Sequence, residues 1–241
     1  MIAKFLLYVL YFLPFCFIGY SLPIETDIKA SSFFVYPLEE IELKAALENN
    51  SYNWKIPSGH LLSKNGNSII WSSTVKEGIY PIFLEGVAPC YILSFRPNSL
   101  VSREQFAYLI SLFLPKKRDV ENKDLNNISN DHWSNKALSL CMQRGIIQAY
   151  PDGSVDPFLH IKKIEAAKML YEWKRNYYGN IEENNLLPKL VFSDLSQKNW
   201  VYSAVQHTID ILPPVSKYVY GVKEILAFKE AREIFNKLKS L

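Results

Sequence analysis

Basic residues at the heads of two helical patterns are the side chains of this sequence best suited to chemistry. Ser102 and Arg103 open one amphipathic stretch, and Lys162 and Lys163 open another. A helix N-terminus presents backbone N–H groups and the positive end of the helix dipole, and an adjacent arginine adds a bidentate partner for a carboxylate. These residues therefore predict the binding of an anionic group.

No catalytic or metal-binding pattern stands out in the sequence. His132, His160 and His207 are scattered without the spacing of metal ligands, and no Ser/His/Asp or Cys/His order accompanies them. Glu182 and Glu183 are adjacent carboxylates, but they lie in the polar stretch GNIEENNLLP, where solvated charge is the ordinary interpretation. We predict a protein that is not an enzyme and that uses neither a metal nor a cofactor.

The composition is typical of folded domains with modest charge. The chain has 241 residues, of which 49% are hydrophobic and 21% charged, which is enough for one large domain or two small ones. Residues 22–97 carry 6 basic and 8 acidic side chains, a net charge of −2, and residues 98–241 carry 20 and 16, a net charge of +4. This asymmetry is too weak for nucleic-acid binding, but it is compatible with an anionic polymer on the C-terminal part.

The first 21 residues, MIAKFLLYVLYFLPFCFIGYS, have the layout of a secretory signal peptide. One charge, Lys4, precedes an apolar run that ends among small residues. A permanent membrane anchor is the alternative, but the run has about 16 residues against the ~20 needed to span a bilayer. Pro14 also interrupts the run. We predict cleavage and secretion.

Two cysteines, Cys90 and Cys141, remain after this segment. They could form a disulfide in an oxidising compartment. They fall in different predicted domains, however, which favours two buried thiols.

Between residues 22 and 97, short apolar runs alternate with turn residues, which predicts strands. In EIELKAAL the apolar residues recur at every second position, so one face should be buried. We predict about six antiparallel strands in a β-sandwich, with Trp54 and Trp71 between the sheets. The predicted strands are SSFFVYP, EIELKAAL, SYNWKI, NSIIWSS, GIYPIFLEG and CYILSF. The stretch YNWKIPSGHLLSKNGNSIIWSSTVKEGIYPIFLEG resembles the immunoglobulin-like modules of bacterial surface proteins, and another small all-β fold is the alternative.

Beyond residue 97 the apolar period changes to 3.6, which predicts helices. VSREQFAYLISLFLP, IKKIEAAKMLYEW and LAFKEAREIFNKL are similar to one another and begin near residues 101, 161 and 226, a repeat of about 60 residues. Two shorter helices, HWSNKALSLCMQR and NWVYSAVQHTI, precede the second and third copies. Trp133 and Trp200 are expected on the inward faces of these shorter helices.

The stretch GIIQAYPDGSVDP joins two of the predicted helices. Gly145 should end the first helix in a left-handed C-cap, and the isoleucine pair that follows should enter the core. Pro151, Asp152 and Gly153 predict a β-turn. The following Asp-Pro step should keep the chain extended as far as the next helix.

At this point the chain resembles a known family. DHWSNKALSLCMQRGIIQAYPDGSVDPFLHIKKIEAAKMLYEW resembles the S-layer homology motif, whose order is a Trp-led helix, Gly, an apolar pair, a Tyr-Pro-Asp-Gly turn, Pro and a Thr-Arg-Ala-Glu-type helix start. VSREQFAYLISLF resembles the second half of such a motif. VFSDLSQKNWVYSAVQHTIDIL followed by ILAFKEAREIFNKL resembles a whole motif that lacks the Pro-Asp-Gly turn. The copies lie near residues 98–118, 124–178 and 190–241.

The resemblance implies a pseudo-threefold, all-helical domain that binds cell-wall polymer, commonly pyruvylated polysaccharide attached to peptidoglycan. The family's Thr-Arg-Ala-Glu tetrad falls on 102–105, 162–165 and 227–230, and only the first copy keeps its arginine. Lys163 keeps the charge but loses the planar fork of arginine, and Phe228 cannot bind an anion through its side chain. We expect one binding groove around Arg103 and a less specific one around Lys163.

Trp133 and Trp200 are candidate platforms for a sugar ring, with core packing as an equal alternative. The predicted domains are a signal peptide at 1–21, an immunoglobulin-like all-β sandwich at 22–97 and an all-α S-layer homology region at 98–241. The predicted function is non-covalent anchoring in the cell envelope on polysaccharide or peptidoglycan, with envelope proteins as partners of the β module. The alternative is that the degenerate repeats act as a protein–protein assembly module.

Overall fold

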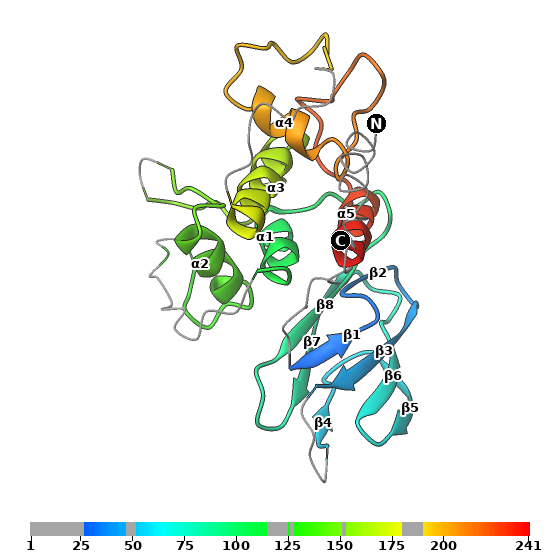
Figure 1. The fold of residues 1–241 in the computed structure, drawn as a ribbon. Coiled ribbons are helices and arrows are strands. Elements are labelled where there is room, and N and C mark those ends of the chain that lie inside the picture. The colour runs from blue at the N-terminus through cyan, green and yellow to red at the C-terminus, as the bar shows by residue number, and fades with distance from the viewer. Residues whose placement is uncertain (1–26, 47–51, 115–124, 126–127, 151–152, 180–189) are drawn as a thin grey trace, which may run out of the picture.

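The computed structural model describes residues 27–46, 52–114, 125, 128–150, 153–179 and 190–241. These residues form eight strands and five helices, with the strands at one end of the molecule and the helices at the other (Figure 1). The strands are β1 (Ile28–Ala30), β2 (Phe34–Val35), β3 (Glu40–Ala45), β4 (Trp54–Lys55), β5 (His60–Asn65), β6 (Ser68–Ser72), β7 (Gly78–Leu84) and β8 (Cys90–Ser94). The helices are α1 (Arg103–Ser111), α2 (Asn135–Gln143), α3 (Lys163–Tyr178), α4 (Tyr202–Thr208) and α5 (Phe228–Ser240).

All five predicted helices are therefore confirmed. The predicted signal peptide at 1–21 lies outside the described residues. Within the ranges that the structure describes, no helix has both the length and the apolar character needed to cross a bilayer.

The strands form two four-stranded sheets. One has the order β1-β3-β6-β5 and the other has the order β2-β8-β7-β4. Alternate side chains of β3 are buried, which confirms the period of two. Trp71 of β6 is fully buried, and its ring centroid lies 5.4 Å from that of Tyr80 of β7, so the two sheets pack on each other. Trp54 is only partly buried, against the same core.

The predicted fold class, an all-β immunoglobulin-like sandwich followed by an all-α domain, is wrong. The described chain has eight strands rather than about six, and β2 pairs with β8 in parallel. The helical region also contains β-bridges, so it is not all-α. The physical reason is that these pairings join backbone groups that are distant in the sequence, and they leave no period in the side chains.

Three of these bridges tie the helical region into a closed ring. Segments 100–102, 160–162 and 225–227 precede α1, α3 and α5, and each segment is bridged to the other two. The middle residue of each segment is buried, and its N–H donates to the carbonyl of the middle residue of the next segment at 2.9–3.0 Å. The middle residues of this bridge ring are Val101, Ile161 and Leu226. The ring sets the three helix starts around a pseudo-threefold axis.

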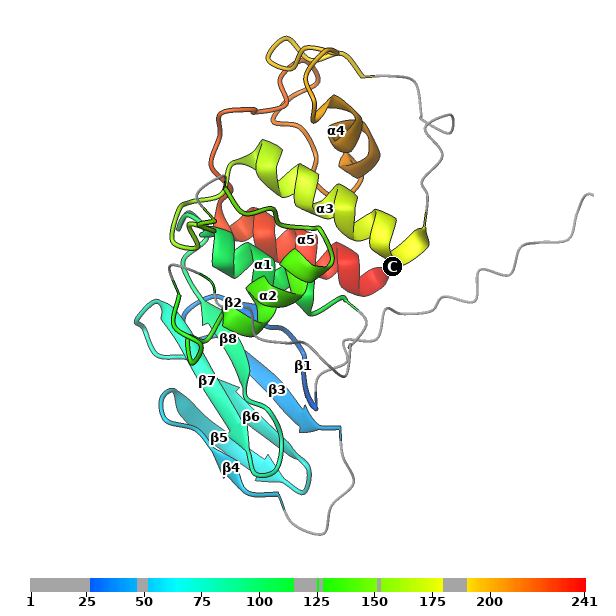
Figure 2. The same ribbon diagram turned by 90° about the vertical axis from the view of Figure 1, so that its left-hand side faces the viewer.

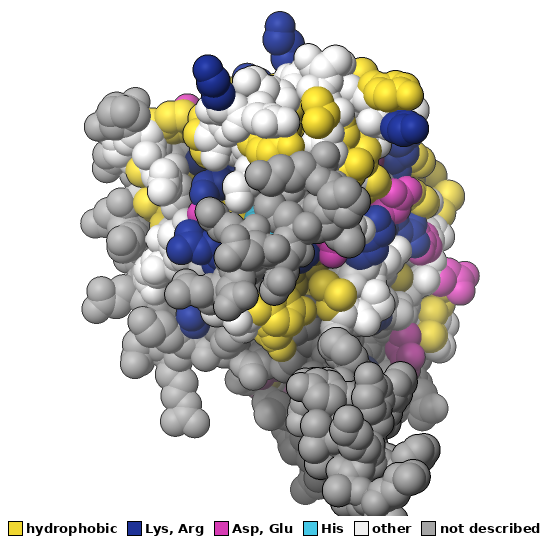
Figure 3. All heavy atoms as spheres, turned by 45° about the horizontal axis from the view of Figure 1, so that its top comes forward, with side chains coloured by type: hydrophobic (Ala, Val, Ile, Leu, Met, Phe, Trp, Pro, Cys, Tyr) yellow, Lys and Arg dark blue, Asp and Glu magenta, His cyan; other side chains and the backbone are white. Residues whose placement is uncertain are grey.

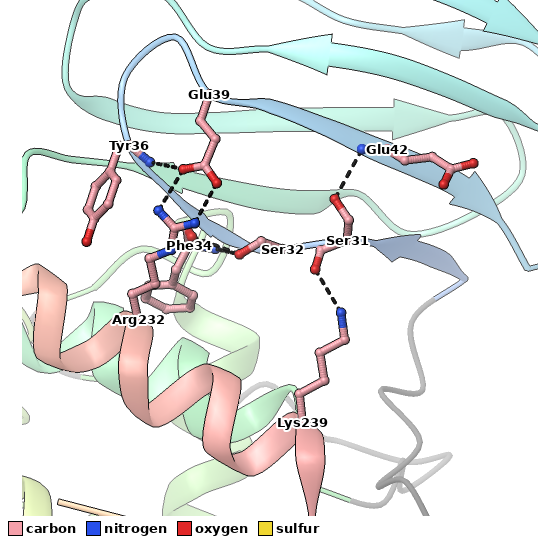
Figure 4. A network of polar contacts seen from close by, with 8 residues as sticks. All are labelled: Ser31, Ser32, Phe34, Tyr36, Glu39, Glu42, Arg232 and Lys239. Atoms are coloured by element: carbon pink, nitrogen blue, oxygen red, sulfur yellow. Dashed lines mark hydrogen bonds and ion pairs between the residues drawn. The ribbon is translucent and has the colours of Figure 1, made fainter.

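The sheets pack against α5. Phe228, at the start of α5, is fully buried, and its ring centroid lies 5.6 Å from that of Phe34 and 5.4 Å from that of Phe95. One turn later, Arg232 donates two hydrogen bonds to the carboxylate of Glu39, at 2.7 and 2.5 Å (Figure 4). The helices α1 and α5 lie between α3 and the sheets (Figure 2). Buried apolar side chains of both parts therefore form one core cluster.

Both cysteines are buried free thiols, as the sequence favours. Burial raises the pKa of Cys90 to about 12. Burial also raises the pKa of Cys141, whose thiol donates to the carbonyl of Ala107 at 3.5 Å.

Candidate functional site

The three helix starts are the positions where the sequence places its anion-binding residues. The first amide of each helix, however, already has a backbone acceptor 2.8 Å away: Arg103 N–H donates to the Leu159 carbonyl. The equivalent bonds run from Lys163 to Glu224 and from Phe228 to Ser99. The expectation of free N–H groups is therefore wrong at these first amides, because the residues beside the bridge ring bring carbonyls onto the helix ends. Attraction of an anion must come from side chains.

Ser102 caps α1. Its hydroxyl accepts from the N–H of Gln105 at 3.3 Å, and the Gln105 side chain accepts from the N–H of Ser102 at 2.9 Å. Ser102 is buried, so this capping box holds the helix start rather than presenting a hydroxyl to a ligand. Its rigidity fixes the position from which Arg103 extends.

Arg103 lies in a groove of about 290 Å³, here called the Arg103 groove. One terminal nitrogen of its guanidinium donates to the Tyr150 hydroxyl at 2.8 Å, and the other donates to the Gln148 carbonyl at 3.0 Å. The guanidinium carbon lies 5.0 Å from the centroid of the Tyr150 ring. A guanidinium has five N–H donors, so these two bonds aim the group without using all of its donors. The groove is lined by Arg103, 145–150, Ile161, Glu165, Lys168, Met169 and Trp200.

The turn after α2 builds one wall of this groove. Gly145 has φ +69°, which confirms the left-handed C-cap, and the two isoleucines after it are buried. Gly153 has φ +79°, and its N–H donates to the Tyr150 carbonyl at 2.8 Å, as expected for the β-turn. Pro151 and Asp152 lie outside the described residues. The turn therefore brings Tyr150 and the Gln148 carbonyl to Arg103.

The Asp-Pro step after the turn differs from its prediction. Asp156 has φ +44° rather than an extended conformation. Aspartate tolerates this left-handed region better than most residues. The bend places the Pro157 carbonyl where it accepts from the N–H of Glu104 at 3.0 Å, and this hydrogen bond satisfies a backbone donor in the first turn of α1.

Lys163 occupies the equivalent position in the second copy, but it is buried. Its ammonium group donates to the Glu230 carboxylate at 3.1 Å and lies 6.0 Å from the Tyr220 ring centroid. A second groove of about 470 Å³ lies beside it, lined in part by Pro213 and Glu224. The charge of Lys163 is thus paired within the chain. Neighbouring Lys162 is exposed, and its backbone N–H donates to Glu165 at 2.9 Å.

The two candidate tryptophans lie in different places. Trp200, expected to face inward, is 73% exposed and lines the Arg103 groove. It precedes α4 by two residues, so the helical period does not set its direction. The face that carries α4 shows hydrophobic side chains interspersed with lysines and arginines (Figure 3). Trp133 lies outside the Arg103 groove and packs against Tyr91 and Tyr108, each with its ring centroid 5.5 Å away.

Tyr150, Gln148, Glu165 and Lys168 belong to the groove but were not identified as site residues from the sequence. The signal for Tyr150 was its place directly before the Pro-Asp-Gly turn, which we interpreted only as turn chemistry. Gln148 contributes a backbone carbonyl, for which no side-chain pattern exists. Glu165 and Lys168 are oriented by the bridge ring and by the ion pair of Lys168 with Glu172.

A buried carboxylate follows Arg103 in the sequence. Glu104, next to Arg103, is 6% exposed and accepts from the Ser134 hydroxyl at 2.7 Å. Burial raises its pKa, against the opposing effects of Ser134 and of His132, whose ring nitrogen lies 3.7 Å away. The group ties the start of α1 to the loop before α2. In the described part of the chain, no cluster of three or more His, Cys, Asp or Glu side chains is arranged to hold a metal.

Comparison with known proteins identifies the central segment. Residues 126–167 match the family model of the S-layer homology domain, which confirms the resemblance seen in the second copy. The matched residues include α2, the turn that builds the groove wall, and the start of α3. The first and third copies lie outside this match.

Two relatives from Acetivibrio thermocellus are similar to this chain. One, "Cell surface glycoprotein 1", is 26% identical over 141 residues, covering 52% of this chain and 6% of its own length. The other, "Cellulosome-anchoring protein", is 25% identical over 136 residues, covering 54% of this chain and 28% of its own length. The chain therefore spans less than a third of either relative.

Proposed function

We propose that this protein is secreted, acts without catalysis in the cell envelope, and attaches non-covalently to an anionic cell-wall polymer. The observation that carries the proposal is the Arg103 groove, where an oriented guanidinium and an exposed tryptophan line one hollow. The S-layer homology segment supports the same role, and so do the names of the two relatives, which refer to a cell surface and to anchoring.

The groove offers matched chemistry to an acidic sugar. Arg103 is a planar donor suited to a carboxylate such as a pyruvate ketal, and Trp200 presents an exposed ring for stacking on the sugar. Glu165 and Lys168 also line the groove, and the charge of Lys168 is paired with Glu172. Pyruvylated polysaccharide attached to peptidoglycan is the polymer that we propose.

One competent groove is expected rather than three. Glu230 pairs with Lys163 in the second copy, and Phe228 in the third copy is covered by the sheets. Binding through a single groove should be weak for an isolated sugar, and a polymer with repeated acidic units would add avidity.

Co-sedimentation with native cell-wall sacculi tests the proposal. The wild-type protein should pellet, and it should stay soluble after chemical removal of the wall-linked polysaccharide. Arg103→Ala should weaken binding at least about tenfold, since a charge-assisted contact is worth roughly 1.5–3 kcal/mol. Arg103→Lys should restore only part of it, because lysine lacks the fork.

Arg96→Ala is the matched control, because Arg96 is an exposed arginine of the β part whose pairing with Glu77 contributes little. If Arg103→Ala pellets as well as wild type, the groove is not the attachment site. If the wild-type protein does not pellet with the sacculi, the proposed anchoring role is wrong.

A second candidate function is a protein–protein assembly module. The observation that favours it is the third copy, where the helix start packs through Phe228 and Arg232 against the sheets of the same chain and is not open to a sugar. Sedimentation equilibrium tests it: a stable oligomer that is indifferent to sacculi would support assembly, and a monomer that pellets with them would oppose it.

A further inference from the structure

A third hollow lies between the sheets and the helices. This junction cavity has a volume of about 440 Å³ and is framed by the start of β8, by α1 and by α2 with the loop before it. It shares no lining residue with the Arg103 groove. The helices α1 and α2 lie above the end of the sheet that holds β8 (Figures 1 and 2). The residues that line it and carry the argument below are Tyr91, Tyr108, Asp131, Trp133 and Lys136.

Three aromatic rings form one side of the junction cavity. Tyr91, Tyr108 and Trp133 meet edge to face, with centroid separations of 5.5–6.1 Å. The Tyr108 hydroxyl donates to the Tyr91 carbonyl at 2.9 Å and accepts from the Tyr91 N–H at 3.0 Å. Tyr108 is buried, whereas the other two rings keep part of their surface exposed. The cluster is therefore a fixed platform with accessible aromatic surface.

The rim of the cavity carries charges of both signs. Asp131 and Lys136 line it, and both are exposed. Asp27 also lines the cavity, so two carboxylates face one lysine, which disfavours an anionic ligand. All three groups can exchange hydrogen bonds with an uncharged ligand. A pocket of this size, apolar inside with a few polar groups at its edge, is typical of sites for small amphipathic ligands.

We propose that the junction cavity binds an uncharged pyranose ring of a glycan. Such a ring has an apolar C–H face that can stack on Trp133 while its edge contacts Tyr91, and equatorial hydroxyls that can reach Asp131 and Lys136. An alkyl chain would leave the polar rim unused, and an acidic sugar would meet Asp131. The junction cavity thus selects an uncharged sugar, whereas the Arg103 groove selects an acidic one. Residues of both the β part and the helical repeats line the junction cavity.

Calorimetric titration of the full protein with cellotetraose and chitotetraose, two neutral pyranose oligomers, tests this site. At least one of them should bind with a saturable 1:1 isotherm. Trp133→Leu should weaken that binding by about tenfold or more, as expected for a central aromatic anchor. Lys136→Ala changes only an exposed rim residue and should weaken it by a few fold, which keeps the test valid if the Trp133 variant does not fold.

Arg103→Ala is the control that separates the two sites, and it should leave tetrasaccharide binding unchanged even if the anchoring proposal fails. The proposal is overturned if neither oligomer binds. It is also overturned if Arg103→Ala abolishes binding while Lys136→Ala does not alter it. Saturable binding of a short tyrosine-rich peptide in place of both sugars would identify the cavity as a protein-docking site instead and would equally reject the sugar.

Discussion

Substitution of Glu230 by glutamine would remove the charge that is paired with Lys163. The Lys163 side chain is only 4% exposed and its partner 27%, and the two groups are 3.1 Å apart. Loss of one partner from a fully buried ion pair costs about 3–5 kcal/mol. Glu230, however, is partly solvated. Its carboxylate also accepts from the N–H of Ala227 at 3.0 Å, and the amide oxygen of glutamine can still accept that bond. We therefore expect a loss of about 2 kcal/mol, near the lower end for a charged hydrogen bond.

Urea unfolding at neutral pH measures this loss, and thermal unfolding should show a midpoint lower by roughly 4–8 °C for a chain of this size. Glu233→Gln is the matched control, because it removes the same charge from an exposed position of α5 and should change stability by less than about 0.5 kcal/mol. The double variant Lys163→Met, Glu230→Gln should recover most of the loss. Equal stability of Glu230→Gln and wild type would refute the claim that the buried charge of Lys163 depends on its pairing with Glu230.

Three further predictions concern the core and the buried titratable groups. Phe228→Ala should cost about 3–5 kcal/mol in chemical unfolding and speed proteolysis between the sheets and α5, whereas the exposed Phe158→Ala should do neither. The pKa of Glu104 is higher in the folded chain than in the unfolded chain, so protonated Glu104 stabilises the fold at low pH and this stabilisation is lost as the pH rises through the raised pKa. Glu104→Gln should therefore be more stable than wild type at pH 7, and the two proteins should be equally stable below about pH 4. Cys90 and Cys141 should react with a thiol reagent only at the rate of unfolding, and fast labelling of the native protein would contradict their burial.

Local patterns were sufficient for much of the fold. The 3.6-residue period predicted all five helices, and the order of glycine, isoleucine pair and Tyr-Pro-Asp-Gly predicted the S-layer homology segment and the positive φ of Gly145 and Gly153. The strand β5 was missed because all six of its side chains are exposed and show no alternation. The strand β1 was missed because it has only three residues.

The composition of the site needed the tertiary structure. The sequence identified Arg103, but the hydrogen bonds that aim it come from residues 45 and 47 positions away. It placed Trp200 inward, because the helical period was extended to a residue that precedes the helix. The sequence predicted Lys163 as a less specific anion-binding residue than arginine. In the structure its ammonium group pairs with the carboxylate of Glu230, which lies 67 positions later in the chain.

The sequence by itself determined the five helices and the family of the central repeat, because these depend on residues within a few turns of one another. Only the tertiary structure decided which helix start stays open to a ligand. The bridge ring brings carbonyls from distant segments onto the helix ends, Glu230 neutralises the second start, and the sheets cover the third. Such pairings depend on distances through space, and neither the period nor the spacing of residues along the chain encodes them.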